Sequence, residues 1–205
     1  MHITTTFRRK LDKPDFVRMN LPEAFWRVRV QGVSQDCQAH VTRYLSKIHD
    51  MVSMGAGLIL FGEEGRGKTG IAALIAKEAR SFGYTAYFTT VWEMREMIRS
   101  RINYTDEQSV MSRAREVDVL VLDDLRMEDI DQGWFGRSEI EALVSDRVAR
   151  RRITLITTRM SAAEIQGKLK SLMSVSKDGL VPFPVRGEDK RAVTQRELQA
   201  AIFGK

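Results

Sequence analysis

The residues best suited to chemistry form one glycine-rich segment, Gly62-Glu63-Glu64-Gly65-Arg66-Gly67-Lys68-Thr69. Its spacing matches the phosphate-loop pattern G-x-x-x-x-G-K-[ST]. Glycines let the backbone wrap around phosphates, and successive amides at a helix start offer them positive potential. The expected nucleotide contacts are Glu64, Gly65, Arg66, Gly67, Lys68, Thr69 and Gly70.

Two side chains of this segment have predicted roles in phosphate chemistry. Lys68 is expected to reach the β- and γ-phosphates, and the Thr69 hydroxyl to bind Mg²⁺. Glu63 and Glu64 are expected to face solvent, because a carboxylate is unfavourable beside a polyanion.

A second candidate group is the acidic pair Asp123-Asp124, which follows the apolar run 119–122. Side chains alternate along a strand, so the two carboxylates are expected to point in opposite directions. Asp123 is then placed to hold Mg²⁺ with Thr69, and Asp124 to orient or polarise an attacking water. Alone, such a pair is more typical of a loop or helix cap. The phosphate loop upstream favours the metal site.

Strands and helices must position these residues, and apolar runs alternate with helical patterns along the chain. The strand-like runs are 57–61, 85–89, 119–122, 153–157 and 180–185. The first four are almost continuously apolar, as in parallel strands buried on both faces. Pro182 and Pro184 remove hydrogen-bond donors from the fifth, which predicts an edge strand.

Apolar residues recur at helical spacing between these runs, over 71–82, 91–102, 140–148 and 165–172. Gly83 is expected to cap the first helix at its C-terminal end. Three pairs have capping-box spacing: Ser161 with Glu164, Thr105 with Gln108, and Thr194 with Glu197. The alternation predicts a three-layer α/β fold with right-handed crossovers, with a polar arm over 1–20 and one domain over 21–205.

The composition is that of a globular domain: 205 residues, 43% hydrophobic and 29% charged, which excludes a disordered or fibrous chain. Thirty-three Lys and Arg against 27 Asp and Glu favour an anionic partner, although a solubilising charge excess is the alternative. The single Cys37 excludes an internal disulfide and predicts a reducing compartment, the cytoplasm. The start has no signal-peptide pattern, and the most apolar stretch, 51–61, is too short to cross a membrane.

The phosphate loop and the acidic pair together resemble those of AAA+ ATPases of the DnaC/IstB type, the helicase loaders and transposition helper proteins of bacteria and phages. The resemblance covers about residues 50–195. Segment 83–94 is similar to the family's second strand and following helix, segment 98–115 to its helical insertion, and segment 21–29 to the part that packs near the adenine. It implies a parallel five-stranded sheet of order 5-1-4-3-2, the AAA+ core of a P-loop NTPase, with little or no lid.

The same resemblance implies ATP and Mg²⁺ as cofactors and ATP hydrolysis as the activity. Its implied partners are single-stranded DNA and a replicative helicase, or a transposase in an IstB-like helper. It also implies a homo-oligomer with nucleotide at subunit interfaces and no membrane association. A non-hydrolysing, nucleotide-dependent binding module is the alternative of another class.

The positions of arginines bear on the choice between a hydrolysing ATPase and a non-hydrolysing binding module. Arg159 stands at the end of the 153–159 strand, where the family commonly has Asn. We expect it to face the γ-phosphate and to act as a catalytic residue. No Arg lies between 160 and 185, where the family has an arginine finger and this chain has Lys168 and Lys170. Arg191 matches the family's sensor 2 position, or is a solvated arginine before the last helix.

Other basic and aromatic residues have two interpretations each. Four residues are expected DNA contacts by the resemblance, or an ordinary solvated helix face: Arg95, Arg99, Arg101 and Tyr104. Four arginines stabilise the end of the third helix, or reach a neighbouring subunit's nucleotide: Arg147, Arg150, Arg151 and Arg152. Trp134 and Phe135 are buried, or form an exposed contact patch.

Overall fold

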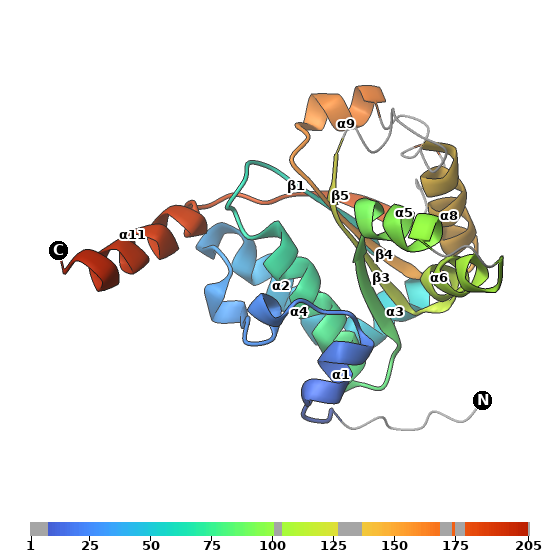
Figure 1. Ribbon diagram of the computed structural model, residues 1–205, viewed down its shortest axis with the longest axis horizontal. Coiled ribbons are helices and arrows are strands. Elements are labelled where there is room, and N and C mark those ends of the chain that lie inside the picture. The colour runs from blue at the N-terminus through green and yellow to red at the C-terminus, as the bar shows by residue number, and fades with distance from the viewer. Residues whose placement is uncertain (1–7, 101–103, 127–136, 169–173, 175–178, 205) are drawn as a thin grey trace.

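The computed structural model describes residues 8–100, 104–126, 137–168, 174 and 179–204. Its centre is a parallel sheet (Figure 1). The strands are β1 (Gly57–Phe61), β2 (Ala86–Thr90), β3 (Val119–Leu125), β4 (Ile153–Thr158) and β5 (Leu180–Pro184). Their order, β2-β3-β4-β1-β5, confirms the expected 5-1-4-3-2 sheet.

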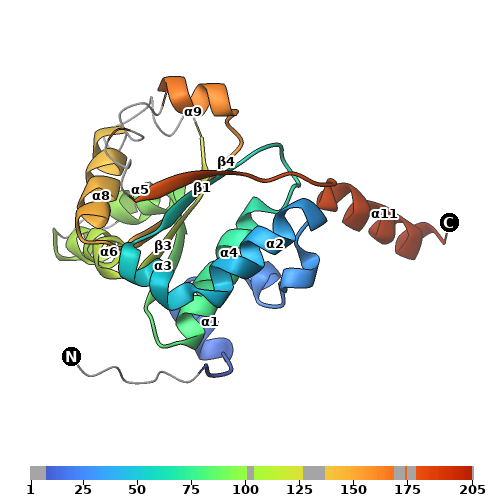
Figure 2. The same ribbon diagram turned by 180° about the vertical axis from the view of Figure 1, so that it is seen from behind.

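Helices cover both faces of this sheet, which confirms the three-layer architecture (Figures 1 and 2). One layer holds α1 (Lys13–Arg18), α2 (Gln35–Ser46), α3 (Ile48–Met54) and α4 (Lys68–Ser81). The other holds α5 (Val91–Ser100), α6 (Tyr104–Glu116), α8 (Arg137–Ala149) and α9 (Ala162–Lys168). Short 3-10 turns lie at Glu23–Phe25 and Val30–Gly32, and α11 (Lys190–Phe203) extends away from the layers.

The alternating side chains of the strands fill two separate cores. In β1, Leu58 and Leu60 pack in the cluster that includes α4, whereas Ile59 packs with the opposite layer. Within the described ranges no helix has both the length and the hydropathy of a membrane span. Strand β5 pairs only with β1 and is largely exposed, which confirms the edge position predicted from its prolines.

One of the predicted helix starts differs from the structure. The box at Ser161 is confirmed: its N–H donates to Glu164 Oε2 at 2.8 Å, and its hydroxyl accepts from the Glu164 N–H at 3.3 Å. The start predicted at Thr194 is wrong, because α11 begins at Lys190. The structure describes α6 from Tyr104, one residue before the predicted start at Thr105, and the side chains of Thr105 and Gln108 lie outside the described set. Residues 190–193 are mostly good helix formers, and the Lys190 N–H donates to Gly65 O, so α11 extends back to the phosphate loop.

Part of the predicted polar arm belongs to the packed structure. Asp15 and Met19 are buried, and Asp15 accepts hydrogen bonds from Arg9 at 2.6 Å and from Arg80 of α4 at 3.1 Å. The bonds from Arg9 hold the pKa of Asp15 far below its usual value. This ion-pair group fastens α1 to the end of α4.

Arg147 of α8 is fully buried and ties three elements together. It donates to the carbonyls of Ala114 and Val117 at the end of α6, at 2.7 and 2.8 Å, and to the Ile153 carbonyl and the Thr154 hydroxyl of β4. Arg147 therefore has a structural role, but at the end of α6 and in β4, and not at the end of its own helix as the sequence predicted. Burial leaves it unable to reach a neighbouring subunit's nucleotide.

We predict that Arg147→Leu lowers the free energy of unfolding by about 3 kcal/mol or more, because it leaves several buried carbonyl acceptors without a hydrogen bond. The control is Arg150→Leu, which removes an exposed arginine paired with Asp146 and should cost within about 1 kcal/mol. Urea unfolding followed by circular dichroism measures both. Equal effects of the two changes would show that the buried hydrogen bonds add no net stability.

Candidate functional site

The phosphate loop joins β1 to α4, so its amides stand at the start of a 14-residue helix. Gly65 and Gly67 have φ values of +76° and +93°, which side-chain-bearing residues rarely adopt. A Cβ on Gly65 would also lie 1.8 Å from Asp189 Oδ1. The glycines predicted from the motif are thus required by the loop conformation, and a side chain at Gly65 would also have to displace Asp189.

Lys68 lies in the first turn of α4 with its ammonium directed into the loop. Its Nζ donates to the carbonyls of Gly62 and Glu63, each at 2.7 Å. Burial, together with the charge of Arg159, lowers the pKa of Lys68. The side chain is therefore a cation held at the centre of the loop, where it can exchange its carbonyl partners for phosphate oxygens.

The acidic pair does not follow the alternation expected of a strand. Leu122 pairs with Ile156, but Leu125 pairs with Thr158, so β3 has one extra residue between these points. Asp124 has φ +51° in this bulge. Both carboxylates consequently line one cavity, and the expectation that they point in opposite directions is wrong.

The hydroxyl of Thr157, at the end of β4, connects the two acids. It donates to Asp123 Oδ1 at 2.7 Å and accepts the Asp124 N–H at 2.8 Å. Burial raises the pKa of Asp123, although hydrogen bonds from Thr157 and Thr69 oppose this shift. Thr69 of α4 and Asp123 of β3 therefore lie close together in one cavity, which brings the phosphate loop to the acidic pair.

Thr69 and Asp123 together supply donors that fit Mg²⁺. This ion takes hard oxygens such as carboxylate and hydroxyl, and completes its shell with waters and substrate phosphates. Within the described ranges, no cluster of three or more His, Cys, Asp or Glu side chains could hold a metal on its own. A metal at Thr69 and Asp123 would thus depend on a phosphate ligand.

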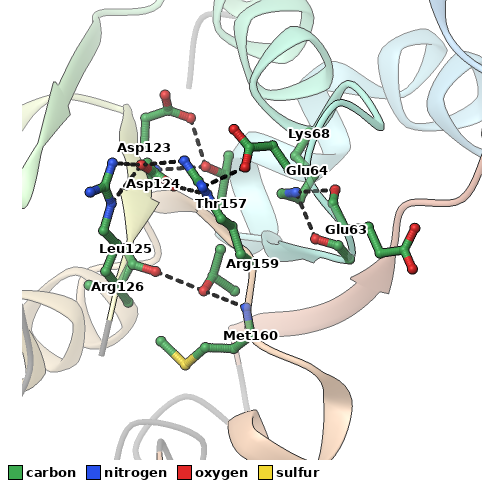
Figure 3. Close-up of polar contacts among 12 residues, drawn as sticks. Glu63, Glu64, Lys68, Asp123, Asp124, Leu125, Arg126, Thr157, Arg159 and Met160 are labelled. Carbon is green, nitrogen blue, oxygen red and sulfur yellow. Dashed lines mark hydrogen bonds and ion pairs between the residues drawn. The ribbon is translucent and has the colours of Figure 1, made fainter. Parts of the chain in front are cut away.

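Arg159 connects the phosphate loop to the acidic pair through ion pairs (Figure 3). Its Nη1 lies 2.6 Å from Glu64 Oε2, and its Nε lies 3.1 Å from Asp124 Oδ1. Arg126 donates to the same carboxylate of Asp124 at 2.8 Å. Burial favours a higher pKa for Asp124, but the bonds from Arg126 and Arg159 outweigh it and lower this pKa.

The two glutamates of the loop differ in environment. Glu63 is exposed and pairs with Arg66, as a solvent-facing side chain can. Glu64 is exposed as well, as expected, but its carboxylate pairs with Arg159 at the edge of the cavity. Arg66 is directed to Glu63 and to the Gly187 carbonyl, and does not line the cavity.

The cavity between these residues has a volume of about 560 Å³ and lies at the carboxyl ends of β1, β3 and β4. Its polar lining comes from the phosphate loop, the acidic pair, Thr157 and four further cations, Arg27, Arg29, Arg159 and Lys190. Phe25 and Val28, from the segment expected near an adenine, form part of its apolar lining. It combines a helix start, cations and an apolar wall, which suits a nucleotide.

Lys190 is a cavity residue that sequence analysis missed. Its N–H donates to the Gly65 carbonyl at 3.1 Å, and its ammonium contacts the Gly32 carbonyl. The sequence pattern had indicated the neighbouring residue, Arg191, as a nucleotide contact. Arg191 lies in α11, and its side chain is outside the described set. Thr157, at the end of β4, is a second cavity residue that sequence analysis missed.

The expected DNA contacts are only partly described. Arg95 is half-buried on α5, whereas Arg101 lies outside the described residues, as do the side chains of Arg99 and Tyr104. Trp134 and Phe135 also lie outside them.

Known proteins resemble this chain over part of its sequence. The chain is 30% identical to the replicative helicase loader DnaI of Bacillus subtilis over 128 residues, which is 62% of this chain and 40% of DnaI. It is 29% identical to an insertion sequence ATP-binding protein of Sinorhizobium fredii over 104 residues, which is 51% of this chain and 34% of that protein. The chain thus spans well under half the length of these relatives.

Solved structures share the fold at low sequence identity. DnaI superposes with a TM-score of 0.65 at 20% identity, over 83% of this chain and 94% of that one. The DnaC helicase loader gives 0.63 at 19% identity, over 80% and 100%, and AMPPCP-bound DnaA from Aquifex aeolicus gives 0.61 at 14%, over 86% and 56%. Residues 34–173, more than half of the chain, match the family described as IstB-like ATP binding protein, and the chain belongs to that family.

Proposed function

We propose that this protein is an Mg²⁺-dependent ATPase of helicase-loader type, which binds and hydrolyses ATP and contacts single-stranded DNA and a replicative helicase. The observation that carries the proposal is the single cavity lined by Lys68, Thr69 and Asp123, which brings a phosphate loop and a carboxylate together. Membership of the IstB-like family and the likeness to DnaI support it.

In this proposal each cavity residue has one task. Lys68 and the amides of residues 64–70 bind the phosphates, and Arg191 is assigned to the same nucleotide. Thr69 and Asp123 would hold Mg²⁺, which neutralises charge on the β- and γ-phosphates. Asp124 orients the water whose oxygen attacks the γ-phosphorus while the bond to the bridging oxygen of ADP breaks.

Arg159 supplies positive charge within the subunit, in the absence of an Arg between 160 and 185. Its guanidinium already faces Asp124 and Glu64, and a γ-phosphate in the cavity would compete with these carboxylates for it. Transfer of Arg159 to the phosphate would free Asp124 from one of its two arginines.

A non-hydrolysing binding module is the second candidate, and the pairing of Asp124 favours it. Two guanidinium groups engage this carboxylate, which leaves it poorly placed to orient water while they remain. An IstB-like transposition helper is the alternative within the ATPase class, supported by the Sinorhizobium fredii relative. Co-purification with a replicative helicase or with a transposase distinguishes the helicase loader from the transposition helper.

The setting we propose is the cytoplasm, in a homo-oligomer with nucleotide at subunit interfaces. The single cysteine, Cys37, is buried and free, which agrees with a reducing compartment.

We predict that Lys68→Ala weakens ATP binding at least tenfold, through loss of charge-assisted hydrogen bonds of about 1.5–3 kcal/mol. Asp124→Asn should keep binding and lower turnover about a hundredfold. Calorimetry and phosphate release, with and without single-stranded DNA, measure the two. Lys47→Ala and Asp36→Asn, at exposed positions, are the controls.

Each failure of this pair of measurements has a distinct meaning. Tight ATP binding without turnover, with or without DNA, would support the binding module and contradict the ATPase. An absence of any heat with ATP and Mg²⁺ would contradict both.

Arg159→Ala is predicted to lower kcat about a hundredfold while KM changes little, because it removes a cation that acts mainly on charge developing in the transition state. Arg126→Ala is the matched control, since Arg126 also binds Asp124 but is not part of the cavity lining. Equal kinetics for the two variants would remove Arg159 from the reaction.

The proposed DNA face is tested by neutralising Arg95, Arg99 and Arg101 together, each to Gln. Loss of phosphate contacts should weaken binding of an oligothymidylate and reduce its salt dependence by about 0.7 per contact. Fluorescence anisotropy over a salt series measures both, with Tyr104→Ala as a test of base stacking. An unchanged affinity and slope would exclude this face.

A further inference from the structure

A second cavity, of about 1100 Å³, lies on the layer formed by α1, α2 and α4. Its walls come from residues 8–11, from residues 26–31, and from the facing sides of α2 and α4. The proposed DNA face on α5 belongs to the opposite layer of the sheet (Figure 2). We call this second cavity the basic cleft.

The charges of the basic cleft are almost all positive. Its ionisable lining residues are Arg8, Arg9, Lys10, Arg27, Arg29, Lys77 and a single acid, Glu78. Arg8 pairs with Glu78 at 2.9 Å, and Arg9 pairs with Asp15. Lys10, Arg27 and Arg29 are exposed, and none of the three has an ion pair with another side chain in the described parts.

An aromatic surface lies among these cations. The ring of Trp26 stacks on Phe16 with centroids 5.2 Å apart. Its indole N–H donates to the Leu21 carbonyl at 2.8 Å, so the ring is fixed, and it remains partly exposed. A fixed aromatic face beside several arginines suits a ligand that carries both phosphates and planar bases.

Lys77 holds the wall that carries these groups. Its Nζ donates to the carbonyls of Phe25, Trp26 and Val28, at 3.1, 3.1 and 2.6 Å. Arg27, Val28 and Arg29 line both the basic cleft and the nucleotide cavity. The two cavities are therefore separated by one short, anchored segment.

We propose that the basic cleft binds single-stranded nucleic acid, with phosphates at Lys10, Arg27 and Arg29 and a base on the Trp26 ring. An acidic peptide would use the cations but leave the aromatic surface without a partner. The proposal rests on the proposed function for the choice of nucleic acid, and adds to it a contact surface separate from α5.

The test compares two triple variants of the full chain without nucleotide. Lys10→Gln, Arg27→Gln and Arg29→Gln together remove the unpaired cations of the cleft. Arg115→Gln, Arg151→Gln and Arg196→Gln remove the same charge from exposed positions outside it. Anisotropy of a labelled oligothymidylate should show an affinity at least tenfold lower for the cleft variant, with a salt slope lower by about 2, as expected for three contacts.

The remaining comparisons distinguish binding in the basic cleft from binding at the proposed DNA face on α5. Loss of binding in the α5 variant with no loss in the cleft variant would overturn the cleft and leave the proposed function standing. Loss in the cleft variant alone would support the cleft and exclude the α5 face. Equal behaviour of the cleft and control variants, or equally strong competition by polyglutamate, would overturn the assignment. Matching thermal melts of both variants establish that each is folded.

Trp26→Ala gives an independent readout, because it removes the stacking surface without changing charge. The affinity for the oligothymidylate should fall several-fold at an unchanged salt slope. Since truncation of Trp26 also weakens its packing on Phe16, Trp26→Phe serves as the folded comparison and should retain most of the affinity. Equal losses in Trp26→Ala and Trp26→Phe would remove stacking from the proposal.

Discussion

Strand β4 lies between β1 and β3, and the hydroxyl of Thr157 at its end determines how the reactive groups meet. This one hydroxyl donates to Asp123 and accepts from the backbone of Asp124, so it fixes the bulge that turns both acids to one side. Without the extra residue in β3, one carboxylate would point into the opposite layer. The closeness of Asp123 to Thr69 then depends on the parallel order of β1, β4 and β3, because the loop that leads to Thr69 follows the carboxyl end of β1 and Asp123 lies near that of β3.

Several charged groups at the cavity are paired within the protein. Glu64 and Asp124 share Arg159, Arg126 adds a second cation to Asp124, and Lys68 is held by carbonyl groups. These pairs hold the charged side chains in position with a small net effect on stability, since most of them remain partly solvated. A phosphate group would offer each cation a more highly charged partner. The same arrangement can therefore serve a nucleotide switch with or without rapid hydrolysis, and kinetics has to distinguish the two.

Two buried or half-buried cations show how the fold uses backbone carbonyls. Arg147 satisfies the end of α6 and the start of β4, and Lys77 satisfies the turn that begins at Phe25. In both cases a long side chain takes the place of water at backbone carbonyls near the ends of elements or in a turn. The first stabilises the layer of α6 and α8. The second fixes the segment between the nucleotide cavity and the basic cleft.

The sequence by itself determined the strand–helix alternation, the phosphate loop, the edge position of β5 and the start of α9 at Ser161. Each of these depends on local geometry: glycines at positive φ, prolines without N–H groups, or a capping side chain three residues from its partner. The shared direction of Asp123 and Asp124, the turn of Glu64 to Arg159, and the place of Lys190 were decided only by the tertiary structure. Each involves partners far apart in the chain, such as Thr157 with Asp123 and Arg159 with Glu64. Such pairs leave no spacing in the sequence, because their proximity arises only when the strands are ordered side by side.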